Sequence, residues 1–581
     1  CALPICNTTG CNNVAIGCCT LLCNTCANDN IAIGSASLAC NTIGNFNVGI
    51  GYCALGRNNT GCDNIALGQT ALQINTIGNQ NIAIGGAALQ SNTTGCGNIA
   101  IGYIGLGSVT TGNSNISIGS IASASTTIGS NNIAMGCLSL YANVSGNSNV
   151  AIGTQAFRFM CGGSNNVALG SLAMYGYLGS GAGYGSNNVA IGNSTLKCNI
   201  SGSNNIALGE RSLGCSYAGN CNIAIGPWTM ACNNGGFQNI AIGYCTMKNI
   251  TNGTNNIGMG CAALNANTCG SQNIALGNYA LYGNTTGQNN IALGTSALQS
   301  NLANNNIALG YTALKCNTTG SGNIAMGYGA LRCNTTGTNN IAIGYLAATN
   351  VVCIGNIAMG YGALRSNTIG SNNIAVGQLA LCTNTTGVSN VAIGWASLAC
   401  HIAGDCNIAL GISSLNSLLT GNNNVAIGAN SGTLLTTGNQ NIMIGVGVQA
   451  PTNTSCNTIT IGTAGFTCQR APSATWTALS DCRDKCSIQA LSLGVGFVKE
   501  LKPVKFVWNT RDGAKTGVPD SGFLAQDLLE IINKYDVKDW LKLACDDNPD
   551  ELVADPGKLI PILVKAIQEL TDRIETLESK Q

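Results

Sequence analysis

Hydrophobic and polar positions repeat along most of the chain with a period of 17 residues. The string Asn-Ile-Ala-Ile-Gly recurs, with Val, Leu or Met replacing Ile, and its closing glycine falls 27 times between Gly17 and Gly462. Two steps of 16 residues and one step of 22 residues, from Gly170 to Gly192, interrupt the period. The idealised unit reads N-I-A-I-G-x-x-A-L-x-x-N-T-T-G-x-x, as in residues 64–80. Because one such unit cannot bury its own apolar face, the repetition predicts a solenoid of stacked units.

Each unit predicts two short strands joined by glycine corners. In Asn-Ile-Ala-Ile the alternation has period 2, which places the two large residues on one face and Ala on the other, and Ala-Leu predicts the second strand. The two glycine slots suit corners that need positive φ or close backbone approach. Parallel pairing of successive units would stack Ile on Ile and Asn on Asn at a spacing of ~4.8 Å. We therefore predict an all-β solenoid, a parallel β-roll about 130 Å long.

The repeat resembles the N-S-V-A-I-G repeat in the heads of trimeric autotransporter adhesins. That resemblance covers residues 1–462 and implies a left-handed parallel β-roll with three chains per trimer. It also implies that the Ala face turns toward neighbouring chains and that the Ile pair fills the core of each chain. Similar repeats occur in viral fibre shafts. The unit here is longer than the family coil, by the Ala-Leu and Asn-Thr-Thr-Gly segments.

Charge divides the chain into regions. Only 8% of the 581 residues are charged, and residues 1–462 hold just eight basic and four acidic side chains. The remaining residues have an ordinary globular composition followed by a charged helix. With the motifs described below, this shift gives a shaft (1–462), a junction (463–479), a globular module (480–557) and a coiled-coil helix (558–581).

Composition also excludes several classes of function. A single His argues against histidine metal centres and His-based triads. A net charge of +1 and 5% aromatic residues give no basis for nucleic-acid binding. No apolar run reaches the ~18 residues of a membrane span, so we expect no membrane insertion, and we expect no cofactor and no metal. The chain begins at Cys1 inside a repeat, so we expect further sequence upstream that attaches it to a virion protein.

Cysteines recur in one slot of consecutive units. One interpretation is axial disulfides, because a step of ~4.8 Å lies within the Cα separation of a disulfide. The other is that cysteine fills a tight slot as a small hydrophobe. Side chains in register point the same way, which is poor disulfide geometry, so we favour reduced packing residues. The slot holds Cys6, Cys23 and Cys40, then Cys198, Cys215 and Cys232, then Cys316 and Cys333.

The longest step, from Gly170 to Gly192, inserts five residues among tyrosines and glycines. Exposed aromatic side chains with an arginine on an otherwise bland rod are candidates for contact with a host receptor or glycan. The alternative is a corner loop without function, because insertions in solenoids lie outside the core. The candidate contacts are Phe157, Arg158, Phe159, Tyr175, Tyr177 and Tyr184. His401 replaces an Asn in its slot, and we assign it no catalytic role.

The C-terminal region has a different set of motifs. Ser480-Asp481-Cys482-Arg483-Asp484-Lys485 is followed by segments 497–509 and 522–527 and by the apolar run 559–570. In this order the motifs closely resemble the endosialidase-type intramolecular chaperone found at the ends of phage tail fibres and tailspikes. The last helix agrees, because its apolar residues alternate steps of three and four as in a coiled coil. These are Ile560, Leu563, Ile567, Leu570, Ile574 and Leu577. Ile and Leu at these positions favour a coiled coil of two helices. The resemblance implies a coiled coil of three helices, and we adopt three.

The resemblance also implies self-cleavage before the serine of the Ser-Asp motif, at the Leu479–Ser480 bond. Ser480 would be the nucleophile and Lys485 its base, since a hydroxyl needs such a partner at neutral pH. Asp481 and Arg483 match the motif and would support the geometry. The alternative is a motif retained for folding only, with cleavage lost. Asp527 stands where the family more often has Glu.

The leading hypothesis is a homotrimeric viral fibre on the virion surface, with a rigid shaft for host attachment and a chaperone that directs trimerisation and then cleaves itself off. No other catalysis is expected. The alternative is a trimeric cell-surface adhesin. An ice-binding solenoid is disfavoured because Ile43, Ile77 and Ile200 interrupt the Thr slots. A glycan-cleaving tailspike is disfavoured because the shaft has almost no carboxylates to pair as acid and base.

Overall fold

The computed structural model describes residues 6–176, 183–462, 488–509, 516–545 and 552–580. The chain divides into two compact units, Cys1–Arg470 and Ala471–Gln581. The first unit contains the repeats and the second contains the C-terminal module.

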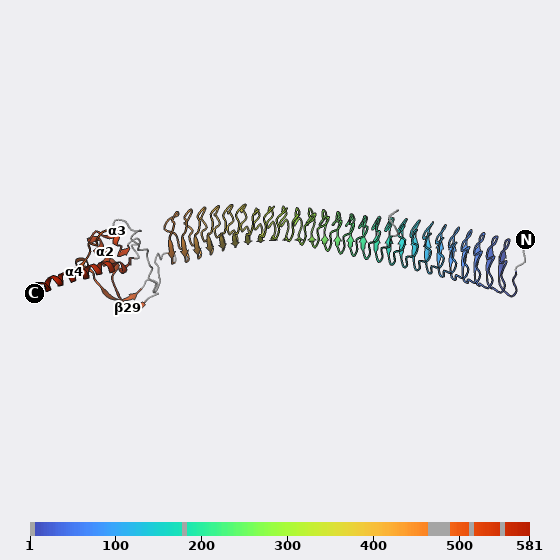
Figure 1. Ribbon diagram of the computed structural model, residues 1–581, viewed down its shortest axis with the longest axis horizontal. Coiled ribbons are helices and arrows are strands. Elements are labelled where there is room, and N and C mark those ends of the chain that lie inside the picture. The colour runs from blue at the N-terminus through green and yellow to red at the C-terminus, as the bar shows by residue number, and fades with distance from the viewer. Residues whose placement is uncertain (1–5, 177–182, 463–487, 510–515, 546–551, 581) are drawn as a thin grey trace. The chain divides into compact units, whose positions relative to one another are not determined.

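The first unit is a parallel β-solenoid of 27 strands, one in each coil, and each strand pairs in parallel with the next (Figure 1). Identical slots lie opposite each other: Ile65 pairs with Ile82, and Ala66 with Ala83. The predicted fold class, with its period of 17, is confirmed. The strands are β1 (Val14–Ile16), β2 (Ile31–Ile33), β3 (Val48–Ile50), β4 (Ile65–Leu67), β5 (Ile82–Ile84), β6 (Ile99–Ile101), β7 (Ile116–Ile118), β8 (Ile133–Met135), β9 (Val150–Ile152), β10 (Val167–Leu169), β11 (Val189–Ile191), β12 (Ile206–Leu208), β13 (Ile223–Ile225), β14 (Ile240–Ile242), β15 (Ile257–Met259), β16 (Ile274–Leu276), β17 (Ile291–Leu293), β18 (Ile307–Leu309), β19 (Ile324–Met326), β20 (Ile341–Ile343), β21 (Ile357–Met359), β22 (Ile374–Val376), β23 (Val391–Ile393), β24 (Ile408–Leu410), β25 (Val425–Ile427), β26 (Ile442–Ile444) and β27 (Ile459–Ile461).

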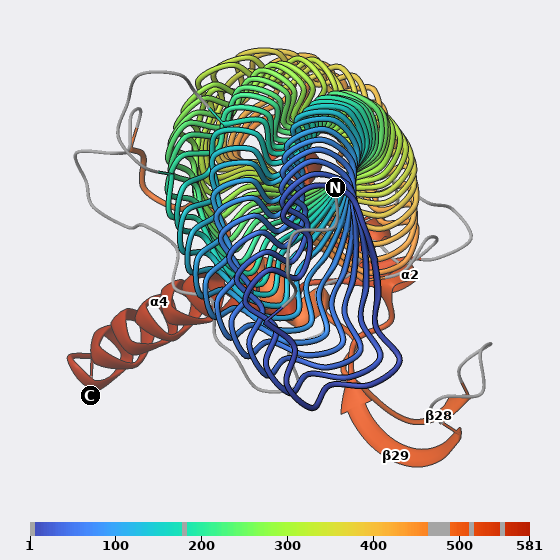
Figure 2. The same cartoon turned by 90° about the vertical axis from the view of Figure 1, so that its right-hand side faces the viewer.

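The second predicted strand is wrong, because the Ala-Leu segment of each coil forms a turn. Leu72 has a φ of 50° and Leu89 a φ of 51°, in the left-handed region that leucine rarely adopts. The turn is held from both directions. Within the coil Asn75 N donates to Leu72 O (3.2 Å), and between coils Leu72 N donates to Ala88 O (2.9 Å). Stacking therefore satisfies the backbone of the turn without a second sheet. Seen end-on, successive coils are similar loops, each shifted a little from the one before (Figure 2).

The expected orientation of the strand faces is also wrong. The middle residue of the strand, as in Ala66, is fully buried, while the flanking Ile65 and Leu67 are partly exposed. The coil is narrow, and the turn fills most of its core with the leucine, so only a small strand residue fits opposite. This complementarity shows in two coils, where a methionine on one side of the core lies opposite a glycine on the other side. A Cβ on Gly258 would lie 2.9 Å from Met247 Cε of the turn, and a Cβ on Gly432 of a turn would lie 2.9 Å from Met443 Cε of a strand.

A buried ladder of asparagines precedes the strands and is unbroken from Asn13 to Asn441. Asn273 is representative: its backbone N and Nδ2 donate to Asn256 Oδ1 (3.0 and 3.1 Å), and Nδ2 also donates to Gly287 O (2.8 Å). Its own Oδ1 accepts two hydrogen bonds from Asn290 (3.0 and 3.1 Å). Every polar atom of the side chain is thus paired, which is what allows an amide to be buried in every coil.

The second asparagine ladder, in the Asn-Thr-Thr-Gly slot, is interrupted. Asn75 Nδ2 donates to Asn58 Oδ1 (2.7 Å) and to Gly78 O (2.9 Å). His401 occupies this slot, as expected, and is fully buried. Its Nε2 lies 3.0 Å from Gly404 O, but its Nδ1 has no hydrogen-bond partner. Burial lowers the pKa of His401, although hydrogen bonds to backbone carbonyls oppose that shift.

The two glycine slots act as expected. The glycine that closes the strand has positive φ, 137° at Gly68. It also permits close approach, since a Cβ on Gly68 would lie 2.6 Å from the backbone oxygen of Gly85, and the glycine of Asn-Thr-Thr-Gly does the same without positive φ, since a Cβ on Gly78 would lie 2.3 Å from the backbone oxygen of Gly95.

The second unit is an α+β module. Its buried core includes Phe497 of α1, Leu528 and Ile532 of α2, and Ile562 of α4. Leu543, which lies between α3 and β30, also belongs to this core. The elements are α1 (Val495–Glu500), β28 (Val504–Asn509), β29 (Thr516–Gly522), α2 (Ala525–Lys534), α3 (Lys538–Leu541), β30 (Ala544–Cys545), β31 (Val553–Ala554), the 3-10 turn η2 (Pro556–Leu559) and α4 (Ile560–Glu578). Strands β28 and β29 pair antiparallel, as do β30 and β31. Pro561 lies in the first turn of α4, where a proline is tolerated.

Candidate functional sites

The predicted cleavage residues lie outside the described residues. Ser480, Asp481, Arg483 and Lys485 all fall within residues 463–487. Their roles therefore stay predictions.

Helix α4 is anchored to the module through one face. Ile562 and Ala566 are buried, and Glu569 Oε2 accepts a hydrogen bond from Val495 N (2.9 Å) at the start of α1. The helix places its other face in solvent: the predicted coiled-coil residues are 40% to 66% exposed. We call this set the α4 seam: Ile560, Leu563, Ile567, Leu570, Ile574 and Leu577. The module does not use the seam for its own core.

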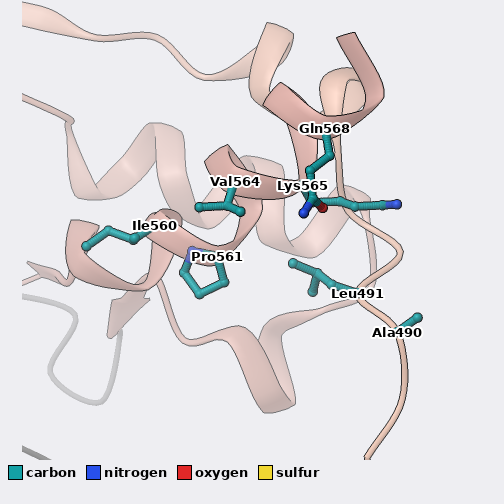
Figure 3. A pocket seen from close by; sticks show the side chains of 7 residues that line it. All are labelled: Ala490, Leu491, Ile560, Pro561, Val564, Lys565 and Gln568. Carbon is teal, nitrogen blue, oxygen red and sulfur yellow. The ribbon is translucent and has the colours of Figure 1, made fainter. Parts of the chain in front are cut away.

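Next to the seam, the start of α4 forms one wall of an open pocket of about 550 Å³ (Figure 3). Its lining is mostly apolar, from Leu491, Pro561 and Val564, with Lys565 and Gln568 at the rim. The lining holds one charged side chain, Lys565, and no acidic side chain.

A polar cluster joins the ends of α1 and α2. Lys534 Nζ donates to Glu500 Oε2 (2.6 Å), and the Tyr535 hydroxyl donates to Glu500 Oε1 (2.9 Å). The hydrogen bond from Lys534, followed by that from Tyr535, lowers the pKa of Glu500. The same contacts raise the pKa of Lys534 and of Tyr535. Phe497 packs edge-on against Tyr535 with ring centres 5.1 Å apart.

On the shaft, part of the predicted receptor set does come together. Arg158 and Tyr175 stand in the same slot of neighbouring coils, flanked there by Tyr141 and Lys197. The guanidinium carbon of Arg158 lies 4.7 Å from the ring centre of Phe159, 5.8 Å from that of Tyr175 and 6.0 Å from that of Tyr141. Arg158 Nη1 donates to the Tyr175 hydroxyl (3.4 Å), and Lys197 Nζ lies 6.0 Å from the Tyr175 ring centre. We call these five residues the aromatic–cation column.

Two other residues of the predicted set lie elsewhere. Phe157 is fully buried in the turn position that leucine holds in other coils, so its assignment as a receptor contact is wrong. Tyr184 is 65% exposed and lies over Gly162 at another corner. Tyr177 lies outside the described residues. The insertion leaves the sheet intact, because β10 pairs with β11 in register, Val167 opposite Val189.

Sequence reasoning missed a second aromatic array. Tyr311, Tyr328, Tyr345 and Tyr361 follow the closing glycine of four consecutive strands. Their rings stack with centres 5.0 to 5.4 Å apart and interplanar angles of 3° to 19°. Each is about half exposed. The signal was present as one residue type recurring at the repeat period.

The cysteine slot is not the tight packing slot that we expected. Cys6, Cys23, Cys40, Cys215 and Cys232 are exposed, and the cysteines of the described coils, from Cys6 to Cys456, are free thiols. Burial, then neighbouring Cys40 and Cys6, raises the pKa of Cys23. Over the same described ranges, no cluster of three or more His, Cys, Asp or Glu side chains could hold a metal ion, and no helix is long and apolar enough to cross a membrane.

Comparison with known proteins identifies one segment. Residues 480–536 match the sequence profile of a peptidase family described as the chaperone of endosialidase. The matched segment begins at the serine of the expected scissile bond and includes α1, β28, β29 and α2. No curated protein and no solved structure matches the chain.

Proposed function

We propose that this chain is a homotrimeric fibre shaft of a virion, that it serves host attachment, and that its C-terminal module directs trimerisation and then cleaves itself off before Ser480. One observation carries the proposal: a module similar to the chaperone of endosialidase follows a solenoid of 27 coils in the same chain.

The need for a chaperone follows from the repeat. Three chains of near-identical coils can pair with an offset of one coil at little local cost, because every slot finds an equivalent partner. Long-range β pairing is slow, and its unpaired edges aggregate. A module that associates first fixes the offset at one end. The exposed α4 seam supports this role, because it presents an apolar heptad stripe that the module itself leaves in solvent.

The proposed cleavage is an acyl transfer within the chain. Lys485, as a neutral amine, accepts the proton of Ser480 Oγ, which attacks the carbonyl carbon of Leu479. The C–N bond to Ser480 breaks, the proton passes to the leaving α-amine, and an ester links Leu479 to Ser480 Oγ. Water then hydrolyses the ester, which leaves the carboxylate of Leu479 and restores the Ser480 hydroxyl. Asp481 and Arg483 support the geometry of this reaction.

The proposed receptor contact is the aromatic–cation column on the shaft. No ion pair to Arg158 or Lys197 occurs among the described residues, and Arg158 Nε is buried without a hydrogen-bond partner. Cations presented on aromatic rings in this way suit a host glycan or a receptor loop that carries carboxylates.

The test of the maturation step is expression of the whole chain. Wild type is expected to give a shaft ending at Leu479 and a fragment of about a hundred residues beginning at Ser480, identified by intact mass and N-terminal sequencing. Ser480→Ala should abolish the fragment while sedimentation still reports a trimer, and Lys485→Ala should slow its release. Ser487→Ala, a serine in the same segment, is the matched control and should cleave normally. Full-length wild type that matches Ser480→Ala would overturn the protease role and leave the chaperone role to its own test.

The alternative function is a trimeric cell-surface adhesin, which the resemblance of the repeat to adhesin heads supports. Immunogold labelling separates the two: a fibre labels virions, and an adhesin labels the cell envelope.

A further inference from the structure

The outer surface of the solenoid sheet is uniformly apolar. We call the first and third residues of the strands β1–β27 the outward face. Its first position is Val or Ile in all 27 strands, and its third position is Ile, Leu, Met or Val. The shielded inner position is less uniform, since it admits Ser117 and Thr460. The slot beyond the closing glycine varies freely, from Ser35 and Gln69 to Glu210. The outward positions are thus more consistently apolar than the inner position behind them. This pattern is typical of a surface that another molecule covers.

The outward face is also continuous along the shaft. The parallel register places Ile274 opposite Ile291 and Leu276 opposite Leu293, so two apolar columns run from coil to coil. Buried asparagines precede the strands and glycines follow them, so no charged side chain adjoins the columns within the strand segment.

The exposed area decides between chance and function. Nineteen of the 54 outward side chains are exposed, for example Met259 and Ile393 at 42% each, and the other 35 are partly exposed. Over the whole shaft this amounts to on the order of 3,000 Å² of apolar surface, whereas a monomer rarely exposes a patch above a few hundred Å². An area of that order matches an obligate subunit interface.

We infer that the outward face is the surface at which copies of this chain pack against one another along the shaft. The inference rests on the proposed self-association and names the face that performs it. The outward face therefore takes the role that the sequence analysis gave to the Ala face, because the Ala face is buried inside each coil. A second copy is the occupant that the pattern specifies, because only a partner with the same coil spacing can match 27 rungs. The α4 seam gives the same chain a second unpartnered apolar stripe, as expected if both form when copies associate.

Photocrosslinking of the whole chain tests the face directly. We would introduce p-benzoylphenylalanine separately at Met259 and Ile393, two outward positions, and at Ser300 as the matched control. Ser300 is exposed in the turn that packs against the strand from the other side of the core. Irradiation of purified trimer should yield covalent dimers and trimers of shaft from Met259 and Ile393, and only background from Ser300.

The possible outcomes separate this inference from the proposed function. A sedimenting trimer that crosslinks equally or only from Ser300 overturns the outward face and leaves the trimer standing. A single chain in sedimentation overturns the self-association itself. If that single chain bound phosphatidylcholine vesicles and crosslinked to lipid from position 259, the outward face would be a membrane-binding surface. This result would also overturn the inference.

Charge substitution provides a second measurement. Ile274→Lys with Ile291→Lys adds two cations to adjacent rungs, and Ser300→Lys adds the same charge outside the face. The double variant should lose the shaft trimer or bind a fluorescent apolar dye, while Ser300→Lys should match wild type. Because the double variant could fail to fold, circular dichroism of its soluble fraction accompanies the assay. A folded double variant with an unchanged trimer contradicts the inference.

Discussion

The shaft and the C-terminal module bury their backbone and side chains by different means. In the shaft, each coil repeats the contacts of the one before: an asparagine paired above and below, an alanine and a leucine in the core, and glycines at the close approaches. In the module, each contact occurs once, such as Glu569 at the start of α1 or Glu500 between Lys534 and Tyr535. Repetition gives the shaft many equal registers, whereas the unique contacts of the module define one. A chain that combines the two can use the module to select the register of the shaft.

The largest expected effect comes from removing the module. Deletion of residues 480–581 should convert soluble trimeric shaft into aggregate, because the chains lose the element that fixes their offset before the coils pair. Size-exclusion chromatography with light scattering is the measurement. Removing the module after the shaft trimer has formed should make no difference, because a high unfolding barrier then holds the trimer. Soluble, correctly sized trimer from the deleted chain would contradict the division of labour between the two regions.

A smaller effect is expected from breaking the continuous ladder of the shaft. Asn273→Ala removes the two hydrogen bonds that Nδ2 donates and the two that Oδ1 accepts, and it leaves the buried backbone N–H of Asn290 without its acceptor. The local free energy of opening should fall by about 3 kcal/mol. Hydrogen exchange of the coils around Asn273 measures it.

The control for that substitution is Gln288→Ala, an exposed position in the same repeat unit. It should leave exchange unchanged. Equal protection in both variants would mean that packing, and not the ladder, stabilises the shaft.

The interrupted ladder offers a gain of stability with a defined pH dependence. His401→Asn restores an amide that can donate both to Gly404 O and to Asn384 Oδ1, and it removes the unpartnered Nδ1. We expect a gain of about 1 kcal/mol in local stability near neutral pH. Burial lowers the pKa of His401 in the folded chain. Between that lowered pKa and the ordinary histidine pKa, the imidazole is therefore protonated in the unfolded chain and neutral in the folded chain. Wild-type stability therefore falls as pH drops below the ordinary histidine pKa, and the advantage of His401→Asn grows there. Hydrogen exchange of residues 384–420 at several pH values checks this; a constant advantage would place His401 outside the buried slot.

Sequence alone gave the period, the parallel stacking, the asparagine ladders and the two uses of glycine, because these follow from identical residues at identical slots. The direction of the strand faces was wrong because alternation separates two faces without saying which is inside. The answer depended on the width of the coil, and that width depends on leucines such as Leu72 in a left-handed turn, which propensity disfavours. Of the candidate sites, Arg158 and Tyr175 could be paired from their common slot, whereas Phe157 was misplaced because its slot is a core slot. The Tyr311 to Tyr361 stack was readable from the period and was overlooked.

The smallest expected effect concerns a unique contact of the module. Glu500→Gln keeps an acceptor for the Tyr535 hydroxyl but loses the charge that pairs with Lys534. Since the contacts lower the pKa of Glu500, its contribution is present above the ordinary carboxylate pKa and is lost as pH falls through the lowered value. The thermal midpoint of the full-length Ser480→Ala protein, which retains the module, should therefore drop slightly on Glu500→Gln at neutral pH and not at all in acid. Glu578→Gln, at the exposed end of α4, is the control and should change neither. If Glu500→Gln lowered the thermal midpoint equally at every pH, the side chain would act through its shape and not its charge. The module would then depend as little on charge as the nearly uncharged shaft does.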